Sequence, residues 1–277
     1  DYVIHLAGLS NDPLGEFDPK ITEEINYRST LNLAKICKAN GVQRFIYAST
    51  QSIYGISKTD NELDEDLSVK NPITEYAKTK FKSELELKEL ADEQFTVTFF
   101  RPSTVFGPSP KLRCDIVFNS LVASAYTTGV VELLSDGSPW RPIVHIEDVC
   151  SAFMAGLIAP SKLINKKAYN VGIKNGNYSV RQLAEAAVEV VPGSKLKFLN
   201  HHTDPRSYKV SFNKIFEELN DYFKPKWNLI DGGLELVDFY KKIDLKENIF
   251  RGFQTNRITQ LKKLIKDKKL NKNLYWN

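Results

Sequence analysis

The sequence predicts an α/β fold, in which a doubly wound parallel sheet is followed by a smaller C-terminal lobe. Strand-like and helix-like segments alternate up to about residue 108, which is typical of parallel strands joined by helices. The strand-like segments are continuous apolar runs, as expected for strands that are buried on both faces. With 277 residues, 42% of them hydrophobic and 26% charged, the chain can bury a large core.

The sheet is expected in the first part of the chain. Strands are predicted at Tyr2–Leu6, Arg44–Ala48 and Thr96–Arg101, with helices near Ile21–Asn40 and Glu75–Ala91. The second helix has clear start signals, because Pro72 and Thr74 precede an amphipathic run that extends to Leu90.

The segment Gly107-Pro-Ser-Pro110 interrupts this alternation. Beyond it, helices are predicted at Asp115–Gly129, Glu147–Leu157, Val180–Val191 and Asn213–Leu219, and strands at Val131–Leu134, Pro142–Ile146 and Ala168–Val171. The run Ser135-Asp-Gly-Ser-Pro139 predicts a turn, because Gly, Asp and Pro favour turn conformations.

Positive charge is concentrated near the C-terminal end. The whole chain carries +4, but residues 241–277 contain 11 Lys/Arg against 3 Asp/Glu, a balance of +8 that leaves −4 for residues 1–240. In residues 250–277, apolar side chains follow helical spacing among the lysines, at Ile258, Leu261, Leu264, Ile265 and Leu270. Such a helix could touch nucleic acid or anionic lipid. We expect it to pack on its own body or on a second copy in a homodimer, so nucleic acid is not an expected partner.

The sequence also bears on compartment and metals. It shows no leader-like segment and no apolar run of 18 residues, which favours a cytoplasmic protein without a membrane partner. No set of His, Cys and carboxylates has the spacing of a metal site, and the three cysteines lack disulfide spacing. We expect Cys37 and Cys150 to be core residues and Cys114 to be accessible.

A tyrosine and a lysine four residues apart form the most informative pair. Three pairs have this spacing: Tyr54/Lys58, Tyr76/Lys80 and Tyr222/Lys226. Only Tyr76 begins a clear helix, since Tyr54 adjoins Gly55 and Pro225 interrupts the third pair. On a helix, Tyr76 and Lys80 share one face, about 6 Å apart along the axis. The ammonium can then lower the pKa of the phenol and suit it to proton transfer. The alternative is a solvated helix with a packed tyrosine.

Thr50 is the third candidate catalytic residue. It follows the apolar run Arg44–Ala48, so it lies just past the carboxyl end of a predicted strand, where open α/β sheets bind ligands. A hydroxyl, a phenol and an ammonium from Thr50, Tyr76 and Lys80 suit hydride chemistry on a sugar alcohol.

These residues resemble the extended short-chain dehydrogenase/reductases of the nucleotide-sugar epimerase/dehydratase group. The resemblance covers most of the chain and is also carried by Val3-Ile-His-Leu-Ala-Gly8, Glu24-Ile-Asn-Tyr-Arg-Ser-Thr30, Phe100-Arg-Pro-Ser-Thr-Val-Phe-Gly107 and Arg141-Pro-Ile-Val-His-Ile-Glu-Asp148. Several motifs that occur in the family's order within one chain identify the family far more specifically than any single motif does. The resemblance implies a Rossmann-like fold, an enzyme, NAD as cofactor with NADP not excluded, and a nucleotide-diphosphate sugar as substrate.

The resemblance also implies a domain division. Residues 1–108 and 142–172 would belong to the dinucleotide-binding domain, 109–141 and 173–249 to the substrate lobe, and 250–277 to a basic tail. The family begins with a strand, a glycine-rich turn and a helix that hold the cofactor pyrophosphate. This sequence begins with Asp1, in a segment similar to the family's fourth strand. We therefore expect an N-terminally truncated fragment without the first βαβ unit, which binds NAD weakly by itself.

Binding residues follow from the same resemblance. It implies contacts to the cofactor from Leu6, Ala7, Gly8, Asn26, Ala48, Pro102, Tyr76 and Lys80, and to the substrate from Thr50, Thr104, Arg113, Asn119, Arg141 and Arg206. Planar guanidinium groups can grip a diphosphate with paired hydrogen bonds. The alternative for each arginine is a surface ion pair, and for Asn119 a turn cap.

The implied reaction is oxidation of a sugar hydroxyl, in which Tyr76 takes the proton, Thr50 shares it, and Lys80 holds the nicotinamide ribose. An epimerase then returns hydride to the other face of the keto sugar. The family's 4,6-dehydratases carry Asp-Glu directly after the catalytic Thr, whereas this chain has Gln51 and Ser52, so dehydration is disfavoured. A nucleotide-sugar reductase or dehydrogenase, and a non-catalytic cofactor-sensing or scaffold protein, are the alternatives.

Overall fold

The computed structural model describes residues 1–57, 61–199 and 207–277. The chain forms two compact units. Unit 1 contains the described residues within Asp1–Ser103, Glu147–Gly176 and Arg206–Lys226. Unit 2 contains those within Thr104–Ile146, Asn177–Pro205 and Trp227–Asn277.

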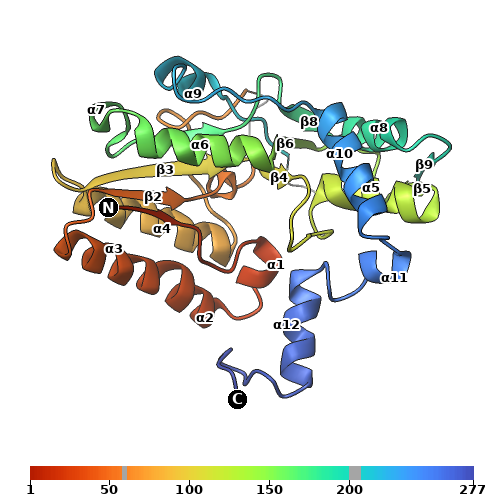
Figure 1. Cartoon of the computed structure of the whole chain (residues 1–277), viewed down its shortest axis with the longest axis horizontal. Helices are drawn as coiled ribbons and strands as arrows, with labels where there is room; N and C mark the ends of the chain where they lie inside the picture. The colour runs from red at the N-terminus through yellow and green to blue at the C-terminus, as the bar shows by residue number, and fades with distance from the viewer. Residues whose placement is uncertain (58–60, 200–206) are drawn as a thin grey trace. The chain divides into compact units, whose positions relative to one another are not determined.

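A parallel sheet forms the centre of unit 1 (Figure 1). Its order is β1 (Tyr2–His5), β2 (Arg44–Ala48), β3 (Thr96–Pro102) and β7 (Ala168–Val171). In register, Val3 lies opposite Phe45, and Phe45 lies opposite Val97. Because adjacent strands are parallel, their carboxyl ends meet at one edge of the sheet.

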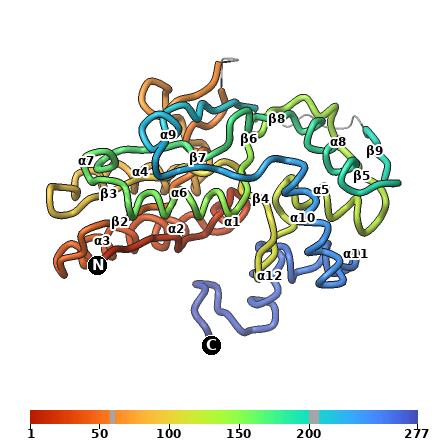
Figure 2. Tube along the Cα trace, turned by 45° about the horizontal axis from the view of Figure 1, so that its top comes forward, coloured from red at the N-terminus to blue at the C-terminus, as the bar shows by residue number. Residues whose placement is uncertain are grey.

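Helices cover both faces of this sheet (Figures 1 and 2). One face packs on α3 (Ser29–Ala39) and α4 (Glu75–Leu90), in a core that includes Phe45, Val97 and Leu87. On the other face, Gly156 of α6 (Ile146–Ile158) approaches Phe100 and Ile46. The helices α7 (Ser161–Ile164) and α9 (Asn213–Glu218) contact β3 and β7, respectively. Since β3 alternates its side chains between the two faces, helices bury both. The predicted doubly wound α/β fold is therefore confirmed.

The segment before α3 is more irregular than the sequence predicts. The expected helix Ile21–Asn40 begins as α2 (Pro19–Glu23) and passes through the π-helical turn η1 (Glu24–Arg28) before α3. Within η1, the Asn26 carbonyl accepts hydrogen bonds from the hydroxyls of Thr30 at 2.9 Å and Ser83 at 3.2 Å. Ser83 belongs to α4, so this wider turn ties the two helices together.

Unit 2 combines short strands with longer helices. One sheet has the order β4 (Thr104–Phe106), β6 (Trp140–His145) and β8 (Asn177–Ser179), and a second consists of β5 (Val130–Leu133) and β9 (Lys195–Phe198). The helices are α5 (Val117–Thr128), α8 (Val180–Val190), α10 (Leu229–Lys242), α11 (Glu247–Phe250) and α12 (Arg257–Lys266). The apolar faces of α5, α8 and α10 meet in one core around Phe118, Leu183 and Leu236. The sequence analysis did not predict β4, β8 or β9, which are only three or four residues long.

The two units differ from the predicted lobes at four places, of which the smallest is residues 173–176, in unit 1 instead of the predicted substrate lobe. Residues 104–108 and 142–146 lie in unit 2 because β4 pairs with β6. Residues 207–226 lie in unit 1, where Val210 bridges Leu63 and the Asn170 amide donates to the Ser211 carbonyl at 3.2 Å. These pairings join segments far apart in sequence, which no local pattern shows.

Two of the three cysteine predictions are wrong. Cys37 is buried as expected, but Cys114 is also buried and Cys150 is exposed. Cys150 lies on the outer side of α6, since an apolar run on a helix does not bury every residue. Within the described ranges, no helix is long and apolar enough to cross a membrane.

Candidate active site

Helix α4 carries two of the predicted catalytic residues. Thr74 caps its start, since the threonine hydroxyl accepts a hydrogen bond from the Ala77 amide at 3.2 Å. Tyr76 lies half-buried in the first turn, and Lys80 lies one turn later and is only 3% exposed. Their spacing puts both residues on one face of the helix.

Lys80 is held at the carboxyl end of β2. Its ammonium donates a hydrogen bond to the Ala48 carbonyl at 2.8 Å and lies 4.7 Å from the centre of the Tyr47 ring. Burial lowers the pKa of Lys80 to about 8, and the Glu84 carboxylate acts in the opposite direction. Lys80 therefore remains mostly a cation at neutral pH, although it is buried.

Thr50 lies on the segment that follows β2. It caps the 3₁₀ helix η2 (Gln51–Tyr54), and its hydroxyl oxygen accepts a hydrogen bond from the Ser52 amide at 3.1 Å. This short helix packs against α4. The structure thus brings the segment of Thr50 to the helix of Tyr76 and Lys80, with the Lys80 contact to Ala48 only two residues before Thr50.

A short helix that the sequence analysis missed supports the start of α4. A methyl group at Gly15, the last residue of α1 (Asp12–Gly15), would lie 2.7 Å from Cβ and 2.9 Å from the backbone nitrogen of Tyr76. The Asp12 carboxylate accepts a hydrogen bond from the Thr74 hydroxyl at 2.7 Å. Four residues are too few to show a helical period, but the Asn11 cap followed by Asp-Pro is a signal that could have revealed the helix.

The predicted cofactor residues around Gly8 lie together after β1. Gly8 has φ +155°, and a methyl group there would lie 3.0 Å from Asn26 Oδ1 and 3.7 Å from Lys80 Nζ. Asn26 is fully buried. Its Oδ1 accepts from the Leu9 amide at 2.7 Å, and its side-chain amide donates to the Leu9 carbonyl at 3.1 Å. Asn26 therefore holds the loop after β1 near Lys80, where only glycine leaves room.

The other cofactor candidates mark the ends of strands. Leu6 and Ala7 follow β1 with exposed side chains, and Pro102 is the last residue of β3. His5, just before them, is buried. Its burial, and next the charge of Lys80, lower the pKa of His5 to about 4, so the imidazole is neutral. The exposed side chains of Leu6 and Ala7 thus follow a residue that carries no charge at neutral pH.

Thr104 and Asn119, two of the substrate candidates, lie in unit 2. Thr104 begins β4. The buried Asn119 of α5 accepts a hydrogen bond from the Gly107 amide at 3.1 Å and donates to the carbonyls of Arg113 at 2.9 Å and Gly107 at 3.4 Å. These contacts agree with the turn-capping alternative, because they engage both polar atoms of the side chain.

The arginine candidates differ in their surroundings. Arg113 Nε lies 2.8 Å from the Asp115 carboxylate, which is the ion-pair alternative. Arg141 donates from Nη1 to the carbonyl of its neighbour Trp140 at 2.8 Å and is half-buried. Arg206 lies outside the described residues.

His145 has a packing role in unit 2. It is fully buried, its Nε2 lies 2.8 Å from a carboxylate oxygen of Glu235, and its ring stacks on Trp227 at 4.1 Å. A methyl group at Gly107 would lie 2.6 Å from Nε2, so the backbone touches the ring. These contacts account for the imidazole without a role in chemistry.

The sequence analysis also missed a network of buried polar side chains in unit 1. It consists of Tyr54, Glu65, Glu84, Arg101 and Asn170, each at most 5% exposed. A signal was present in the sequence, because Arg101 directly follows two phenylalanines in an apolar strand. A buried arginine requires a charged or polar partner, which the sequence alone does not name.

Three comparisons place the chain among known proteins. Residues 1–172 match the model of the NAD dependent epimerase/dehydratase family. The UDP-glucuronate 4-epimerase of Thermodesulfobacterium geofontis (strain OPF15) is 28% identical over 253 residues, which is 89% of this chain and 75% of the relative. UDP-glucuronic acid decarboxylase 1 of Arabidopsis thaliana is 26% identical, over 91% of this chain and 58% of the relative.

Solved structures show the same fold. The UDP-glucose 4-epimerase of Thermotoga maritima, solved with UDP-glucose, superposes with a TM-score of 0.76 at 23% identity, over 88% of this chain and 78% of the other. The UDP-glucuronic acid 4-epimerase of Bacillus cereus, solved with UDP-glucuronic acid and NAD, superposes with a TM-score of 0.73 at 24% identity, over 88% and 76%. Because the family match covers more than half of the sequence, the chain belongs to the NAD dependent epimerase/dehydratase family.

Proposed function

We propose that this chain is part of a nucleotide-sugar epimerase that acts by transient oxidation of a sugar hydroxyl with NAD or NADP. One observation carries the proposal. Lys80 is a buried cation bonded to the Ala48 carbonyl, on the same helical face as Tyr76 and beside the segment of Thr50. A phenol, a hydroxyl and an ammonium at the carboxyl edge of a parallel sheet are the groups that proton removal from an alcohol requires.

The residues present fit the nicotinamide end of such a cofactor. Gly8 leaves open the space that a methyl group would fill between the loop, Asn26 and Lys80. Leu6 and Ala7 expose apolar surface beside it, and Lys80 supplies a hydrogen-bond donor for a ribose hydroxyl. When bound, nicotinamide supplies the acceptor and donor of hydride.

In this proposal, the protein's own residues manage the proton. Tyr76 takes the proton of the sugar hydroxyl through its phenol oxygen, and Thr50 orients that hydroxyl through a hydrogen bond. The positive charge of Lys80 favours the negative charge that Tyr76 acquires. Epimerisation then requires the keto sugar to present its other face before the proton and hydride return.

The residues after Thr50 favour epimerisation over dehydration. The Gln51 side-chain amide donates to the Arg101 carbonyl at 3.0 Å, and Gln51 is fully buried. An amide held in this way is not a proton-transfer acid, and the next residue is Ser52. The removal of water from a sugar needs such an acid, whereas epimerisation does not.

The substrate we propose is a UDP-hexose or UDP-hexuronic acid, as named for the relatives described above. Its diphosphate would be gripped by Arg141 and Arg206, because guanidinium groups bind phosphate oxygens with paired hydrogen bonds. Arg113, which is already paired with Asp115, is the weaker candidate.

The test uses the extended protein, meaning these 277 residues together with any sequence that adjoins them in the full-length protein. UDP-glucose and UDP-glucuronic acid are incubated with it and NAD, and the products are followed by proton NMR. We expect the 4-epimer without net NADH. Tyr76→Phe should lower turnover about 100-fold or more, and Tyr275→Phe, at a side chain that is 70% exposed, should not.

Other outcomes would contradict the proposal. Stoichiometric NADH would identify a dehydrogenase, and an unsaturated keto sugar would identify a dehydratase. Tyr76→Phe with turnover within a few-fold of the parent would remove Tyr76 from the chemistry.

A further inference from the structure

A buried ion pair joins the helix of Tyr76 and Lys80 to the sheet. Arg101 of β3 donates from Nε to one Glu84 carboxylate oxygen at 2.9 Å and from Nη2 to the other at 2.5 Å. Arg101 is 4% exposed and Glu84 is 5% exposed. Glu84 stands one turn after Lys80 on α4, so this two-pronged contact fixes both the height and the rotation of the helix.

The same arginine reaches the segment of Thr50. Its Nη1 donates to the Tyr54 hydroxyl at 3.1 Å, and Tyr54 is the last residue of η2, which Thr50 caps. At the start of η2, the Gln51 side chain donates to the Arg101 carbonyl at 3.0 Å. Arg101 thus bonds to both ends of η2 and, through Glu84, to α4.

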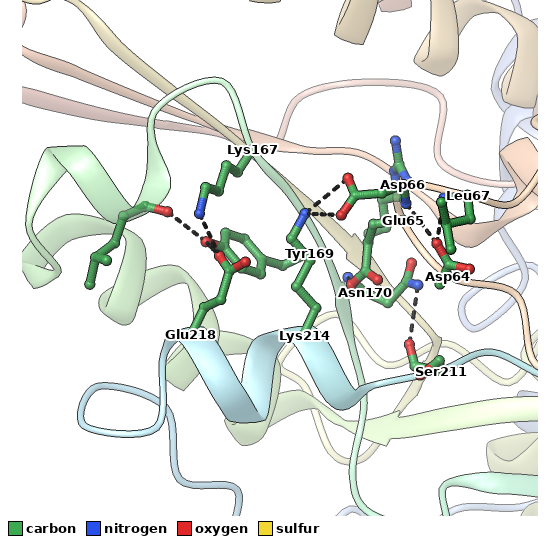
Figure 3. Close-up of polar contacts among 12 residues, drawn as sticks. Asp64, Glu65, Asp66, Leu67, Lys167, Tyr169, Asn170, Ser211, Lys214 and Glu218 are labelled. Carbon is green, nitrogen blue, oxygen red and sulfur yellow. Dashed lines mark hydrogen bonds and ion pairs between the residues drawn. The ribbon is translucent and has the colours of Figure 1, made fainter.

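The far end of this network is fixed as well. The Tyr54 hydroxyl donates to Asn170 Oδ1 at 2.9 Å. Asn170, on β7, donates from its backbone amide to the Glu65 carboxylate at 2.6 Å and from its side chain to the Ser211 carbonyl at 3.2 Å, as Figure 3 shows. Tyr54 is therefore held between β3 and β7, and it cannot move without breaking these contacts.

We infer that Arg101 and Glu84 are positioning residues: they hold η2 and α4 in the relative placement that brings Thr50 to Tyr76 and Lys80. The inference rests on the proposed function for its catalytic meaning. A pair that served only packing would need to hold one element, whereas Arg101 bonds to both elements that carry the candidate catalytic groups. Replacement of a buried ion pair by well-packed apolar residues is often neutral or stabilising, so stability alone does not account for this pair.

Hydrogen exchange in this 277-residue chain tests the inference without substrate or cofactor. In Glu84→Gln, we expect the amides of residues 50–55 and 75–82 to exchange at least ten-fold faster than in the parent, because opening of either element no longer breaks the ion pair. Faster exchange confined to residues near position 84, with 50–55 unchanged, would overturn the inference.

Tyr54→Phe is the second variant, because Glu84→Gln leaves a buried guanidinium without its carboxylate and could fail to fold. It removes only the hydroxyl between Arg101 and Asn170, and we expect faster exchange of residues 50–55. The matched control is Tyr169→Phe, since Tyr169 is also buried, on β7, but its hydroxyl oxygen lies 2.7 Å from both the Leu163 carbonyl and the Glu218 carboxylate, outside the Arg101 network (Figure 3). Equal acceleration in the control would show a general loss of stability and would contradict the inference.

The kinetic constants of the extended protein provide a second test, because a purely structural role of Glu84 would leave kcat and the pH profile of a folded variant unchanged. We expect Glu84→Gln to lower kcat about ten-fold with KM for the sugar nucleotide within two-fold. The alkaline limb of the pH profile should move to lower pH, because Glu84 opposes the lowered pKa of Lys80. The other titratable groups near Lys80 are His5, Tyr47 and Tyr76. The variant also removes the effect of Glu84 on Tyr47, but burial, the larger cause, still keeps the pKa of Tyr47 far above this limb. Unaltered kcat and pH profile in a folded variant would overturn the inference.

The two proposals fail in different ways. Absence of turnover in the parent would reject the proposed epimerase, and hydrogen exchange would still decide the positioning role. Normal turnover in the parent together with unchanged exchange at residues 50–55 in both variants would reject the positioning role alone.

Discussion

Single residues in unit 1 have protonation equilibria that follow from burial. Lys80 and Glu65 are both enclosed, and in each burial shifts the pKa toward the neutral form: it lowers the pKa of Lys80 to about 8, which leaves Lys80 mostly a cation at pH 7, and raises the pKa of Glu65 to about 7. Glu65 accepts a hydrogen bond from the Asn170 backbone amide. This bond and the charges of Lys214 and Arg101 lower the pKa of Glu65, but they offset only part of the increase caused by burial. Glu65 is therefore a group that titrates near neutral pH inside the fold.

We predict that Glu65 makes the protein less stable as pH rises through 7. Its pKa is higher in the folded than in the unfolded chain, so the folded state binds more protons between about pH 4.5 and 7, and the free energy of unfolding falls over this range. Glu65→Gln should remove on the order of 2 kcal/mol of this decline between pH 5 and 8. Urea unfolding of parent and variant at four pH values measures the free energy of unfolding. If this free energy has the same pH dependence in both proteins, the prediction is contradicted.

Among the elements, α4 depends on contacts from three directions. The sheet holds it through the Lys80 contact to Ala48 and through the Glu84 ion pair, and η1 holds it through Ser83. Its first turn rests on α1, where Gly15 approaches the backbone of Tyr76 too closely for any side chain. The orientation of Tyr76 therefore depends on an element of only four residues.

We predict that Gly15→Ala displaces the first turn of α4. The added methyl would lie 2.7 Å from a side-chain atom and 2.9 Å from a backbone atom of Tyr76, so the destabilisation should be about 1–3 kcal/mol, with a fall in kcat of the extended protein. Gly41→Ala is the control, because a methyl there meets no atom within 4 Å. Its φ of +74° should cost about 1 kcal/mol of stability without changing kcat. Equal kcat in both variants would exclude a role of α1 in positioning Tyr76.

The whole molecule divides its candidate residues between two units. The residues proposed for proton and hydride transfer lie in unit 1, and Thr104, Arg113, Asn119 and Arg141 lie in unit 2. The basic tail belongs to unit 2, where α12 contains no fully buried residue.

We predict that Arg141→Leu and Arg206→Leu raise KM for the sugar nucleotide more than they lower kcat in the extended protein. Diphosphate binding is shared by the ground state and the transition state, so its loss weakens both equally. Arg251→Leu, which removes an exposed pair with Glu247, serves as the control and should leave KM unchanged. Initial rates over a range of substrate concentration measure both constants, and a normal KM in both test variants would place the diphosphate elsewhere.

The strands of the parallel sheet and the helix α4 of unit 1 were predictable because their signals are local. The strands Arg44–Ala48 and Ala168–Val171 have the predicted bounds, and the helix from Glu75 ends within one residue of its prediction. An apolar run between polar turns specifies a buried strand, and the i, i+4 spacing alone puts Tyr76 and Lys80 on one face.

Tertiary structure alone decided which distant residues support this site. Arg101 meets Glu84 and Tyr54, Glu65 meets Asn170, and Gly15 meets Tyr76, across separations of 17 to 105 residues. Burial in the folded chain also sets the pKa values of Lys80 and Glu65. A sequence pattern reports which groups are polar or apolar, but the partner of a buried charge is selected by packing in three dimensions, which one sequence does not display.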